Sequence, residues 1–182
     1  MIDVPEREAV THLIRMNDLL DVVIPRGGAG LIRFVVQNAS VPVIETGSGV
    51  CHTYVDRFAD CEKALKIAFN AKAQRPSVCN AMETLLVHEA IASTFLPTML
   101  QEFFEAGVNI FGCEKVQKFD DRVMAATEED WSKEYGDLRL SVKIVSDLSE
   151  AIEHISRYST RHSECIVTED PTSATVFQRS ID

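Results

Sequence analysis

Apolar residues recur along the chain in two alternating patterns, one typical of β-strands and one typical of α-helices. Short runs of adjacent or alternating apolar residues predict strands, and they lie at residues 21–24, 41–44, 51–55, 84–87, 108–111, 138–145 and 165–168. Between these runs, apolar residues three and four positions apart predict amphipathic helices, at residues 5–18, 31–38, 59–74, 91–106 and after Asp147 and Asp170. Strands that alternate with helices predict an α/β fold with a mostly parallel sheet flanked by helices.

Several helix boundaries carry residues that prefer helix ends. Asp147, followed three residues later by a glutamate, resembles a capping box. Asp170 before Pro171 is typical of an N-cap followed by a first-turn proline. Gly107 is well placed just beyond the end of a helix. Pro97 lies inside that same helix, where its missing N–H group predicts either a break or the first turn of a second helical segment.

Composition and charge limit the possible function classes. Apolar residues make up 46% of the 182 residues and charged residues 25%, which is typical of a globular domain. Its 18 basic and 28 acidic residues give a net charge of −10, which argues against a nucleic-acid-binding face or an anionic membrane surface as partner. No apolar run approaches the ~20 residues that a membrane span needs, and the polar N-terminus does not resemble a signal peptide. We therefore expect a cytoplasmic protein.

Cysteine usage points to one candidate nucleophile. Five cysteines without C-x-x-C spacing predict free thiols in a reducing compartment and no metal site. Cys79 stands out because it lies in a polar, proline-containing loop between a predicted helix and a predicted strand. Arg75 and Lys72 lie nearby in the sequence and would favour its reactive thiolate form. Free cysteine is more commonly a small buried residue, and we expect Cys165 to be buried in this way. Because Cys79 lies in a polar loop, we expect it instead to be exposed at a cleft edge.

A second candidate site is the glycine-rich turn between the strand at residues 21–24 and the next helix. Gly27, Gly28 and Gly30 let a ligand approach the backbone, and free N–H groups at a helix N-terminus attract phosphate. The spacing fits neither G-x-G-x-x-G nor a Walker loop, so a plain tight turn explains it equally well. We expect this turn to follow a buried strand and to face the same cleft as Cys79.

Several other polar residues allow two interpretations each. Glu45 lies either at the carboxyl end of a strand, where ligands bind in parallel sheets, or as an exposed charge before a glycine turn. His52 and His88 are candidate general bases, although a lone histidine in a strand is more commonly structural. Glu134 and Tyr135 belong to a charged segment with the only tryptophan, which we expect to run over the surface.

Five segments of the sequence carry a resemblance to a known family. They are residues 24–31 (IPRGGAGL), 50–56 (VCHTYVD), 74–87 (QRPSVCNAMETLLV), 142–145 (VKIV) and 158–164 (YSTRHSE). Together they resemble the γ-glutamyl phosphate reductases, also called glutamate-5-semialdehyde dehydrogenases, of the aldehyde dehydrogenase superfamily. The resemblance implies a Rossmann-like cofactor domain, an aldehyde-dehydrogenase-like catalytic domain and an oligomerisation hairpin. It also implies that NADPH reduces L-glutamyl 5-phosphate to L-glutamate 5-semialdehyde with release of phosphate, the second step of proline biosynthesis.

The resemblance also assigns roles to individual residues. Cys79 matches the nucleophile, whose thiolate attacks the acyl phosphate to form a thioester, and Asn80 follows it beside N–H groups of an oxyanion hole. Glu45 falls where aldehyde-oxidising members keep a general base, which a reductase of acyl phosphates does not need. Glu134 resembles the carboxylate that holds the nicotinamide ribose. The residues that match a turn near the cofactor are Arg26, Gly27, Gly28 and Gly30. The candidates for binding the substrate's amino and carboxylate groups are Arg161, His162 and Ser163.

Members of this family are more than twice as long as this chain, so the resemblance implies a fragment. Residues 1–45 match the end of the cofactor domain, and residues 46–182 match most of the catalytic domain. We expect the chain to be inactive alone and its full-length parent to be a homo-oligomer. Two other functions remain open from the residues: a cysteine hydrolase that pairs Cys79 with His52 or His88, and a non-catalytic association module.

Overall fold

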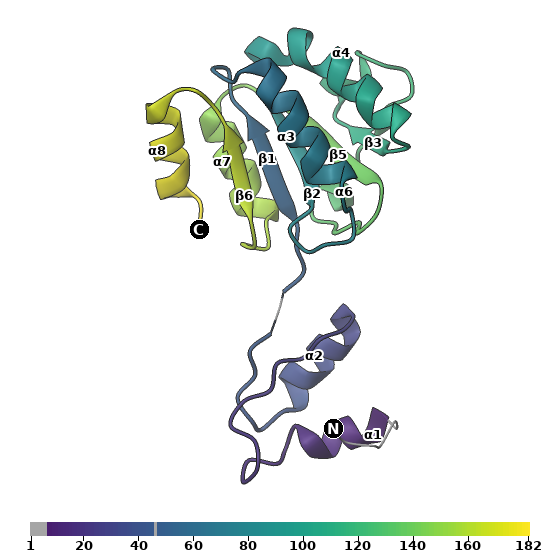
Figure 1. Ribbon diagram of the computed structural model, residues 1–182, viewed down its shortest axis with the longest axis vertical. Helices are drawn as coiled ribbons and strands as arrows, with labels where there is room; N and C mark the ends of the chain where they lie inside the picture. The colour runs from purple at the N-terminus through teal and green to yellow at the C-terminus, as the bar shows by residue number, and fades with distance from the viewer. Residues whose placement is uncertain (1–6, 46) are drawn as a thin grey trace. The chain divides into compact units, whose positions relative to one another are not determined.

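Six strands form one sheet at the centre of residues 49–182 in the computed structural model, which describes residues 7–45 and 47–182 of the chain (Figure 1). The strands are β1 (Cys51–Val55), β2 (Met82–His88), β3 (Asn109–Gly112), β4 (Met124–Ala125), β5 (Arg139–Val145) and β6 (Glu164–Val167). They lie side by side in the order β4-β3-β5-β2-β1-β6, and every neighbouring pair runs parallel. The predicted α/β fold with a parallel sheet is confirmed.

Helices cover both faces of this sheet. On one face lie α3 (Cys61–Ala73) and α4 (Glu89–Glu105), and on the other lie α7 (Leu148–Tyr158) and α8 (Pro171–Ser180) (Figure 1). Two short helices, α5 (Glu114–Gln117) and α6 (Glu128–Trp131), lie along the path from β3 to β5. Among the helices of the described residues, none has both the length and the apolar composition that a membrane crossing requires.

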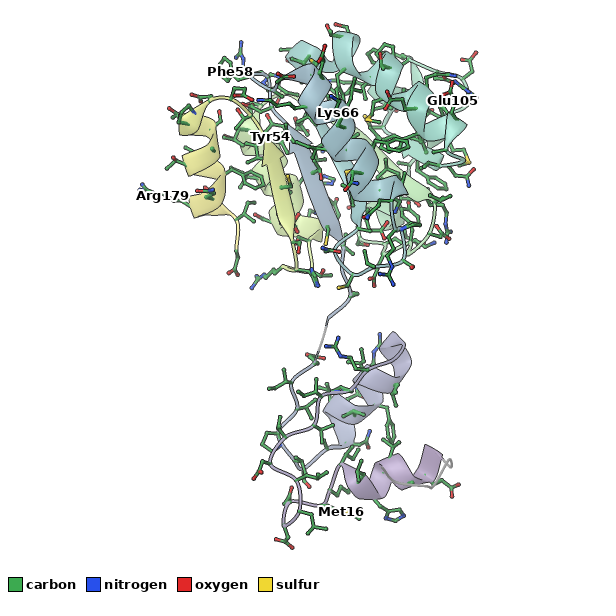
Figure 2. All side chains as sticks on the ribbon, viewed as in Figure 1. Met16, Tyr54, Phe58, Lys66, Glu105 and Arg179 are labelled. Carbon is green, nitrogen blue, oxygen red and sulfur yellow. The ribbon has the colours of Figure 1, made fainter. Side chains whose placement is uncertain are left out.

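The side chains of β2 contribute to two separate parts of the core, because successive residues of a strand point to opposite faces. Leu85 faces α3 and α4 and belongs to the larger apolar cluster, which includes Phe95. Leu86 faces α7 and α8 and belongs to a smaller cluster with Tyr54 and Phe177. Figure 2 shows Tyr54 inside the unit, where its side chain is fully buried. Burying each of these side chains stabilises the fold by roughly 1.5–3 kcal/mol.

The predicted helix ends are confirmed in most details. The carboxylates of Asp147 and Asp170 accept hydrogen bonds from the third residue of α7 and of α8, at 2.9 Å and 2.8 Å. Gly107 follows α4 with a φ angle of 79°, a left-handed conformation that favours glycine. The capping box at Asp147 is only half formed, because the Glu150 carboxylate accepts from the N–H group of Ser146 instead.

The predicted break at Pro97 is wrong, since α4 continues through this residue. Pro97 lies on the exposed face of α4, while its neighbours Phe95, Leu96 and Met99 are buried against the sheet. The apolar packing of these neighbours outweighs one missing main-chain hydrogen bond. A proline on the solvent-facing side therefore does not end this helix.

Residues before Gly49 form a separate compact unit, since the chain divides between Ser48 and Gly49. This unit contains α1 (Arg7–Leu13) and α2 (Ala29–Asn38). The strands predicted at residues 21–24 and 41–44 are wrong: the described segments share a single parallel bridge between Val23 and Val43. An isolated pair of short segments has no further strand to hold it in an extended ladder. The assignment of residues 1–45 to a cofactor domain and 46–182 to a catalytic domain stays a prediction.

The burial expected for Val22 and Ile24 is also contradicted. Both side chains are exposed, at 41% and 53% of their surface. The interior of this unit is formed instead by Ile14, Val35 and Val41, which are at most 2% exposed. The glycine turn therefore does not follow a buried strand, because no apolar layer among the described residues covers the side chains of Val22 and Ile24.

The charged segment between β3 and β5 is more firmly packed than the sequence indicates. Trp131 and Tyr135 are both 8% exposed, so the expectation that Tyr135 is a solvated residue is wrong. The Tyr135 hydroxyl donates to Asp130 Oδ1 at 2.9 Å, and its ring stacks on Phe111 at a centroid distance of 5.7 Å. An amphipathic side chain is thus buried with its polar end satisfied.

Candidate functional site

The Cys79 turn lies between α3 and β2, at the amino end of the parallel strands. Cys79 is exposed, as predicted. Gly49 precedes β1 and Ser163 precedes β6, so their segments lie at the same edge of the sheet. Ligand sites in open parallel sheets commonly lie at the opposite, carboxyl edge. The candidate nucleophile is therefore held by segments that enter the strands, not by those that leave them.

Two contacts hold the main chain of Cys79. The Cys51 thiol donates a hydrogen bond to the Cys79 carbonyl oxygen, with 3.3 Å between Sγ and O. A Cβ atom placed on Gly49 would lie 1.7 Å from the same oxygen. Within the turn, the N–H group of Ala81 donates to the carbonyl of Val78 at 3.0 Å. The turn is thus fixed both internally and against the start of β1.

Cys51 itself is a buried, protonated thiol. It is 3% exposed, and burial raises the pKa of the Cys51 thiol to about 12, with a further contribution from the nearby Glu164 charge. Its Sγ lies 3.9 Å from His162 Nδ1. Because this thiol keeps its proton near neutral pH, it acts as a hydrogen-bond donor and not as a second nucleophile.

The expected influence of Lys72 on the Cys79 thiol is not supported by its contacts. The Lys72 ammonium is fully buried and lies 2.6 Å from the Glu83 carboxylate. The other oxygen of Glu83 accepts from the N–H group of Gly136 at 3.0 Å. Burial lowers the pKa of Lys72 and raises the pKa of Glu83, and each group opposes the shift of the other. Lys72 precedes Cys79 in the chain and Glu83 follows it. The ion pair between these two residues therefore joins the two ends of the Cys79 turn.

His52 is a structural residue. Its ring is buried, and Nδ1 lies 3.0 Å from Glu164 Oε2, which also accepts from the His52 N–H group at 2.8 Å. The Ser159 hydroxyl donates to the other oxygen of Glu164. These contacts join the start of β1 to the start of β6 and the loop before it, and the His52 side chain is 0% exposed.

His88 lies at the far end of β2 from Cys79. Its Nδ1 caps α4 by accepting from the N–H group of Ala90 at 3.0 Å. The strand Met82–His88 separates it from the Cys79 turn, and at about 3.3 Å per residue this strand is roughly 20 Å long. Among the described residues, no hydrogen bond joins either histidine to Cys79, because His52 pairs with Glu164 and His88 caps α4. The structure therefore gives the cysteine hydrolase alternative no support.

Cys165 is exposed, which corrects the expectation that it is buried. It lies on the edge strand β6, whereas α3 packs against the more central strand β2. A hollow of about 130 Å³ opens there and reaches Asn80. It is lined by Cys51, His52, Thr53, Ile67, Ala71, Asn80, Met82, Ser163, Glu164 and Cys165. An edge strand exposes side chains that a central strand would bury.

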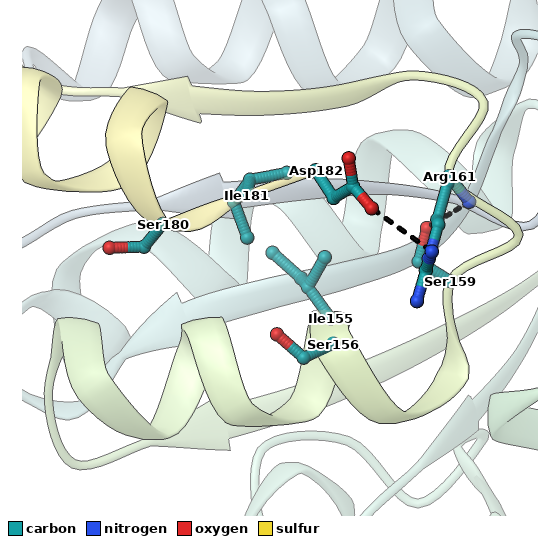
Figure 3. Close-up of a pocket in the computed structure, with 7 residues that line it drawn as sticks. All are labelled: Ile155, Ser156, Ser159, Arg161, Ser180, Ile181 and Asp182. Carbon is teal, nitrogen blue, oxygen red and sulfur yellow. Dashed lines mark hydrogen bonds and ion pairs between the residues drawn. The ribbon is translucent and has the colours of Figure 1, made fainter.

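Arg161 does not point into the hollow beside Asn80. Its guanidinium forms an ion pair with Asp182, with 3.0 Å between Nη1 and Oδ2, at a second hollow of about 70 Å³ between the ends of α7 and α8 (Figure 3). Arg161 has a φ angle of 59°, which is uncommon outside glycine. The N–H group of Arg161 donates to the Ser159 hydroxyl at 2.7 Å, which stabilises this strained turn. Of the three substrate-binding candidates, Ser163 lines the hollow that reaches Asn80, and His162 contacts Cys51.

The remaining predicted site residues lie on exposed segments of the two units. In the first unit, Arg26 and Glu45 are exposed, and Gly28 is the N-cap of α2 without a side-chain hydrogen bond. In the second unit, Asn80 and Glu134 are exposed. Their roles stay predictions, as does the expectation that the glycine turn faces the same cleft as Cys79.

Sequence reasoning missed three residues that hold the turn: Gly49, Cys51 and Glu83. Glu83 carried a usable signal, because a lone charge within an apolar strand segment is expected to be paired. Gly49 and Cys51 carried none, since their contacts to Cys79 join segments about 30 residues apart in the sequence.

Comparison with known proteins shows which enzymes this chain is similar to. No protein-family model matches the chain. A γ-glutamyl phosphate reductase of Clostridium acetobutylicum is 55% identical over all of this chain, which covers 43% of that relative. The crystal structure of a γ-glutamyl phosphate reductase of Thermotoga maritima matches with a TM-score of 0.96 and 51% identity, over 100% of this chain and 44% of its own. A propionaldehyde dehydrogenase of Clostridium phytofermentans, at 18% identity, shares the fold with a TM-score of 0.75 over 98% of this chain and 48% of its own. The chain thus has the aldehyde dehydrogenase fold, spans less than half the length of these relatives, and is similar over its full length to γ-glutamyl phosphate reductases.

Proposed function

We propose that this chain carries the thiol-bearing part of an NADPH-dependent reductase that converts L-glutamyl 5-phosphate to L-glutamate 5-semialdehyde and phosphate. The observation that carries the proposal is the exposed Cys79 on a turn held from both sides, in a chain 55% identical to a γ-glutamyl phosphate reductase. A thiol that is both accessible and fixed is what nucleophilic catalysis on an acyl phosphate requires. The proposal extends to a cytoplasmic, homo-oligomeric full-length enzyme.

The proposed chemistry begins at the Cys79 sulfur. The thiolate attacks the carbonyl carbon of the acyl phosphate, a C–S bond forms, and the C–O bond to phosphate breaks with its electron pair leaving on phosphate. Main-chain N–H groups at Cys79 and Asn80 lie beside the reacting carbon and stabilise the oxyanion. A bound nicotinamide would supply the hydride that turns the thioester into the aldehyde, and breaking the C–S bond would restore the Cys79 thiolate. No general base is needed to activate water, so Glu45 has no obligatory part in this route.

The glycine turn is suited to an anionic cofactor. Among the residues that the structure describes, no side chain caps the N-terminus of α2, and its first turn carries no acidic residue. Apart from the chain neighbours and, for Gly30, the backbone of α2 itself, no described atom lies within 4 Å of where a Cβ on Gly28 or Gly30 would stand, so the backbone is open to approach. Free N–H groups at such a helix end bind phosphate oxygens, and we assign this role to Arg26, Gly27, Gly28 and Gly30. We assign the exposed Glu134 carboxylate to the ribose hydroxyls. Bound NADPH supplies the hydride.

A half-reaction tests the thiol assignment without the cofactor. The purified chain is incubated with acetyl phosphate and, separately, with freshly prepared L-glutamyl 5-phosphate, and each cysteine-containing peptide is examined by mass spectrometry for a hydroxylamine-sensitive acyl group. We expect acylation at Cys79, with L-glutamyl 5-phosphate reacting faster than acetyl phosphate.

The matched control is Cys165, which is also exposed. Cys79→Ser should abolish thioester formation, whereas Cys165→Ser should retain it. Acylation of both thiols at equal rates, or of Cys165 alone, would show that exposure and not a built site governs the reaction, and the proposal would fail.

A further inference from the structure

We infer that Gly49 and Cys51 are positioning residues that fix the main chain of the Cys79 turn against the start of β1. The functional meaning of this inference rests on the proposed function, because it takes Cys79 as the nucleophile. Gly49 and Cys51 lie at the entry to β1, and Cys79 lies at the entry to the neighbouring strand β2. The two segments therefore meet at one edge of the sheet although they are far apart in the sequence.

Gly49 acts by allowing a close approach. A Cβ atom on residue 49 would lie 1.7 Å from the Cys79 carbonyl oxygen, 2.7 Å from its carbonyl carbon and 3.2 Å from its Cα atom. All three contacts are to main chain, which cannot turn aside as the end of a flexible side chain can. Any residue other than glycine at this position must displace the turn that carries the thiol.

Cys51 acts through its S–H group. Its Sγ lies 3.3 Å from the Cys79 carbonyl oxygen, and the side chain is 3% exposed. Burial keeps the pKa of this thiol far above neutral, so the proton that forms the hydrogen bond is retained at physiological pH. A serine at this position would keep a donor, and an alanine would remove it.

The segment that presents both residues is itself anchored on each side of Cys51. The Val50 N–H group donates to Thr160 Oγ1 at 2.9 Å, and the His52 N–H group donates to Glu164 Oε2 at 2.8 Å. Both acceptors belong to the loop and strand that follow α7. The exposed Cys79 turn is thus held in place by the buried main chain of β1, which is itself hydrogen-bonded to β6 and the loop before it. Its position does not depend on contacts within the turn alone.

Two matched pairs of variants test the inference on the 182-residue chain. Cys51→Ala removes the donor and Cys51→Ser retains it. Gly49→Ala introduces the blocked Cβ, and Gly47→Ala is its control, because no described atom outside its chain neighbours lies within 4 Å of a Cβ there. Hydrogen–deuterium exchange is measured across residues 75–81. Iodoacetamide alkylation of each cysteine is followed by peptide mass spectrometry.

We expect Cys51→Ala to raise amide exchange across residues 75–81 by about fivefold to tenfold, the size expected when one hydrogen bond that holds a local segment is lost. Gly49→Ala should raise it at least as much, because the added Cβ displaces the Cys79 carbonyl that accepts this bond. The ratio of the Cys79 to the Cys165 alkylation rate should rise in the same two variants. Cys51→Ser and Gly47→Ala should both match the parent. Because the effect is confined to the turn and is rescued by serine, it differs from a general loss of stability.

Unchanged exchange across residues 75–81 in Cys51→Ala overturns the inference, and so does an equal rise in all peptides of the chain. If Gly49→Ala does not fold, the two Cys51 variants decide the question by themselves. Neither readout involves an acyl phosphate or NADPH. A failure of thioester formation would therefore count against the proposed function without bearing on whether Gly49 and Cys51 position the turn.

Discussion

The Lys72 ammonium and the Glu83 carboxylate lie 2.6 Å apart in the interior, with 0% and 2% of their side-chain surfaces exposed. Lys72 belongs to the last turn of α3, and Glu83 is the second residue of β2, so the pair closes the loop that contains Cys79. The second oxygen of Glu83 accepts from the N–H group of Gly136, in the loop that also carries Glu134. One buried carboxylate therefore joins the segments proposed to hold the nucleophile and the cofactor ribose.

Glu83→Leu should destabilise the chain by about 3–5 kcal/mol, because it leaves the Lys72 charge buried without its counterion. The double variant Lys72→Met/Glu83→Leu should recover most of this loss, since an apolar pair can replace a buried ion pair at little cost. The free energy of unfolding in urea gives the measurement. A double variant less stable than Glu83→Leu would contradict this account.

An exposed ion pair supplies the control for that prediction. Lys63 and Glu169 lie 2.8 Å apart, with 62% and 59% of their side-chain surfaces exposed. Water and salt screen such a pair, so Lys63→Met should leave the unfolding midpoint close to that of the parent. The contrast between the two pairs separates burial from charge as the source of the effect.

His154 should make stability depend on pH. Its ring is 4% exposed and lies edge-on to Trp131 at a centroid distance of 5.3 Å. Burial, more than the nearby charges of His52 and Lys143, lowers the pKa of His154 from 6.5 to about 3. Between these two values the unfolded chain binds the proton and the folded chain does not. Stability therefore rises with pH over this range and should fall by about 2 kcal/mol between neutral pH and pH 5.

The variant His154→Phe tests this contribution, because it removes the titrating group and also an Nε2 atom that has no described hydrogen-bond partner. Urea unfolding at several pH values should give a flatter dependence for the variant than for the parent. Carboxylates contribute equally to both chains, so the difference between the two curves isolates His154. Parallel curves would show that His154 has no part in the acid sensitivity.

Cys79→Ser should leave stability nearly unchanged while abolishing thioester formation. The side chain is exposed, and substitutions at exposed positions commonly change the free energy of unfolding by less than about 0.5 kcal/mol. Residue 79 contacts Gly49 and Cys51 through its main-chain carbonyl group, which a serine retains. Thermal unfolding and the acylation assay measure the two properties. A large loss of stability would indicate that the thiol itself is packed and not free to react.

The chain alone should show no complete turnover. Hydride transfer needs the reacting atoms about 3–3.5 Å apart, and a misplacement of about 1 Å can cost 10²-fold in rate. The relatives that this chain resembles are more than twice its length, so we expect cofactor contacts to come from segments outside it. The assay supplies glutamate semialdehyde, NADP and phosphate and follows the absorbance of reduced cofactor. Turnover by residues 1–182 near the rate of a full-length relative would refute this expectation.

Local periodicity was sufficient to predict much of the fold. The strand predicted at residues 51–55 coincides with β1, and the caps at Asp147 and Asp170 are present as expected. These features depend on residues close together in the chain. The strands predicted at residues 21–24 and 41–44 were wrong because the same apolar pattern forms a ladder only when neighbouring strands are available.

By itself, the sequence determined that the fold is α/β and that Cys79 lies on an exposed turn, because apolar spacing and a polar loop between a helix and a strand are local properties. Only the tertiary structure decided what surrounds that turn. It buries Lys72 against Glu83 and brings Gly49 and Cys51 onto the Cys79 carbonyl. It also separates His88 from Cys79 by the length of β2. These relationships join residues that are distant in sequence, and they follow from the order and register of the strands, which no single segment encodes.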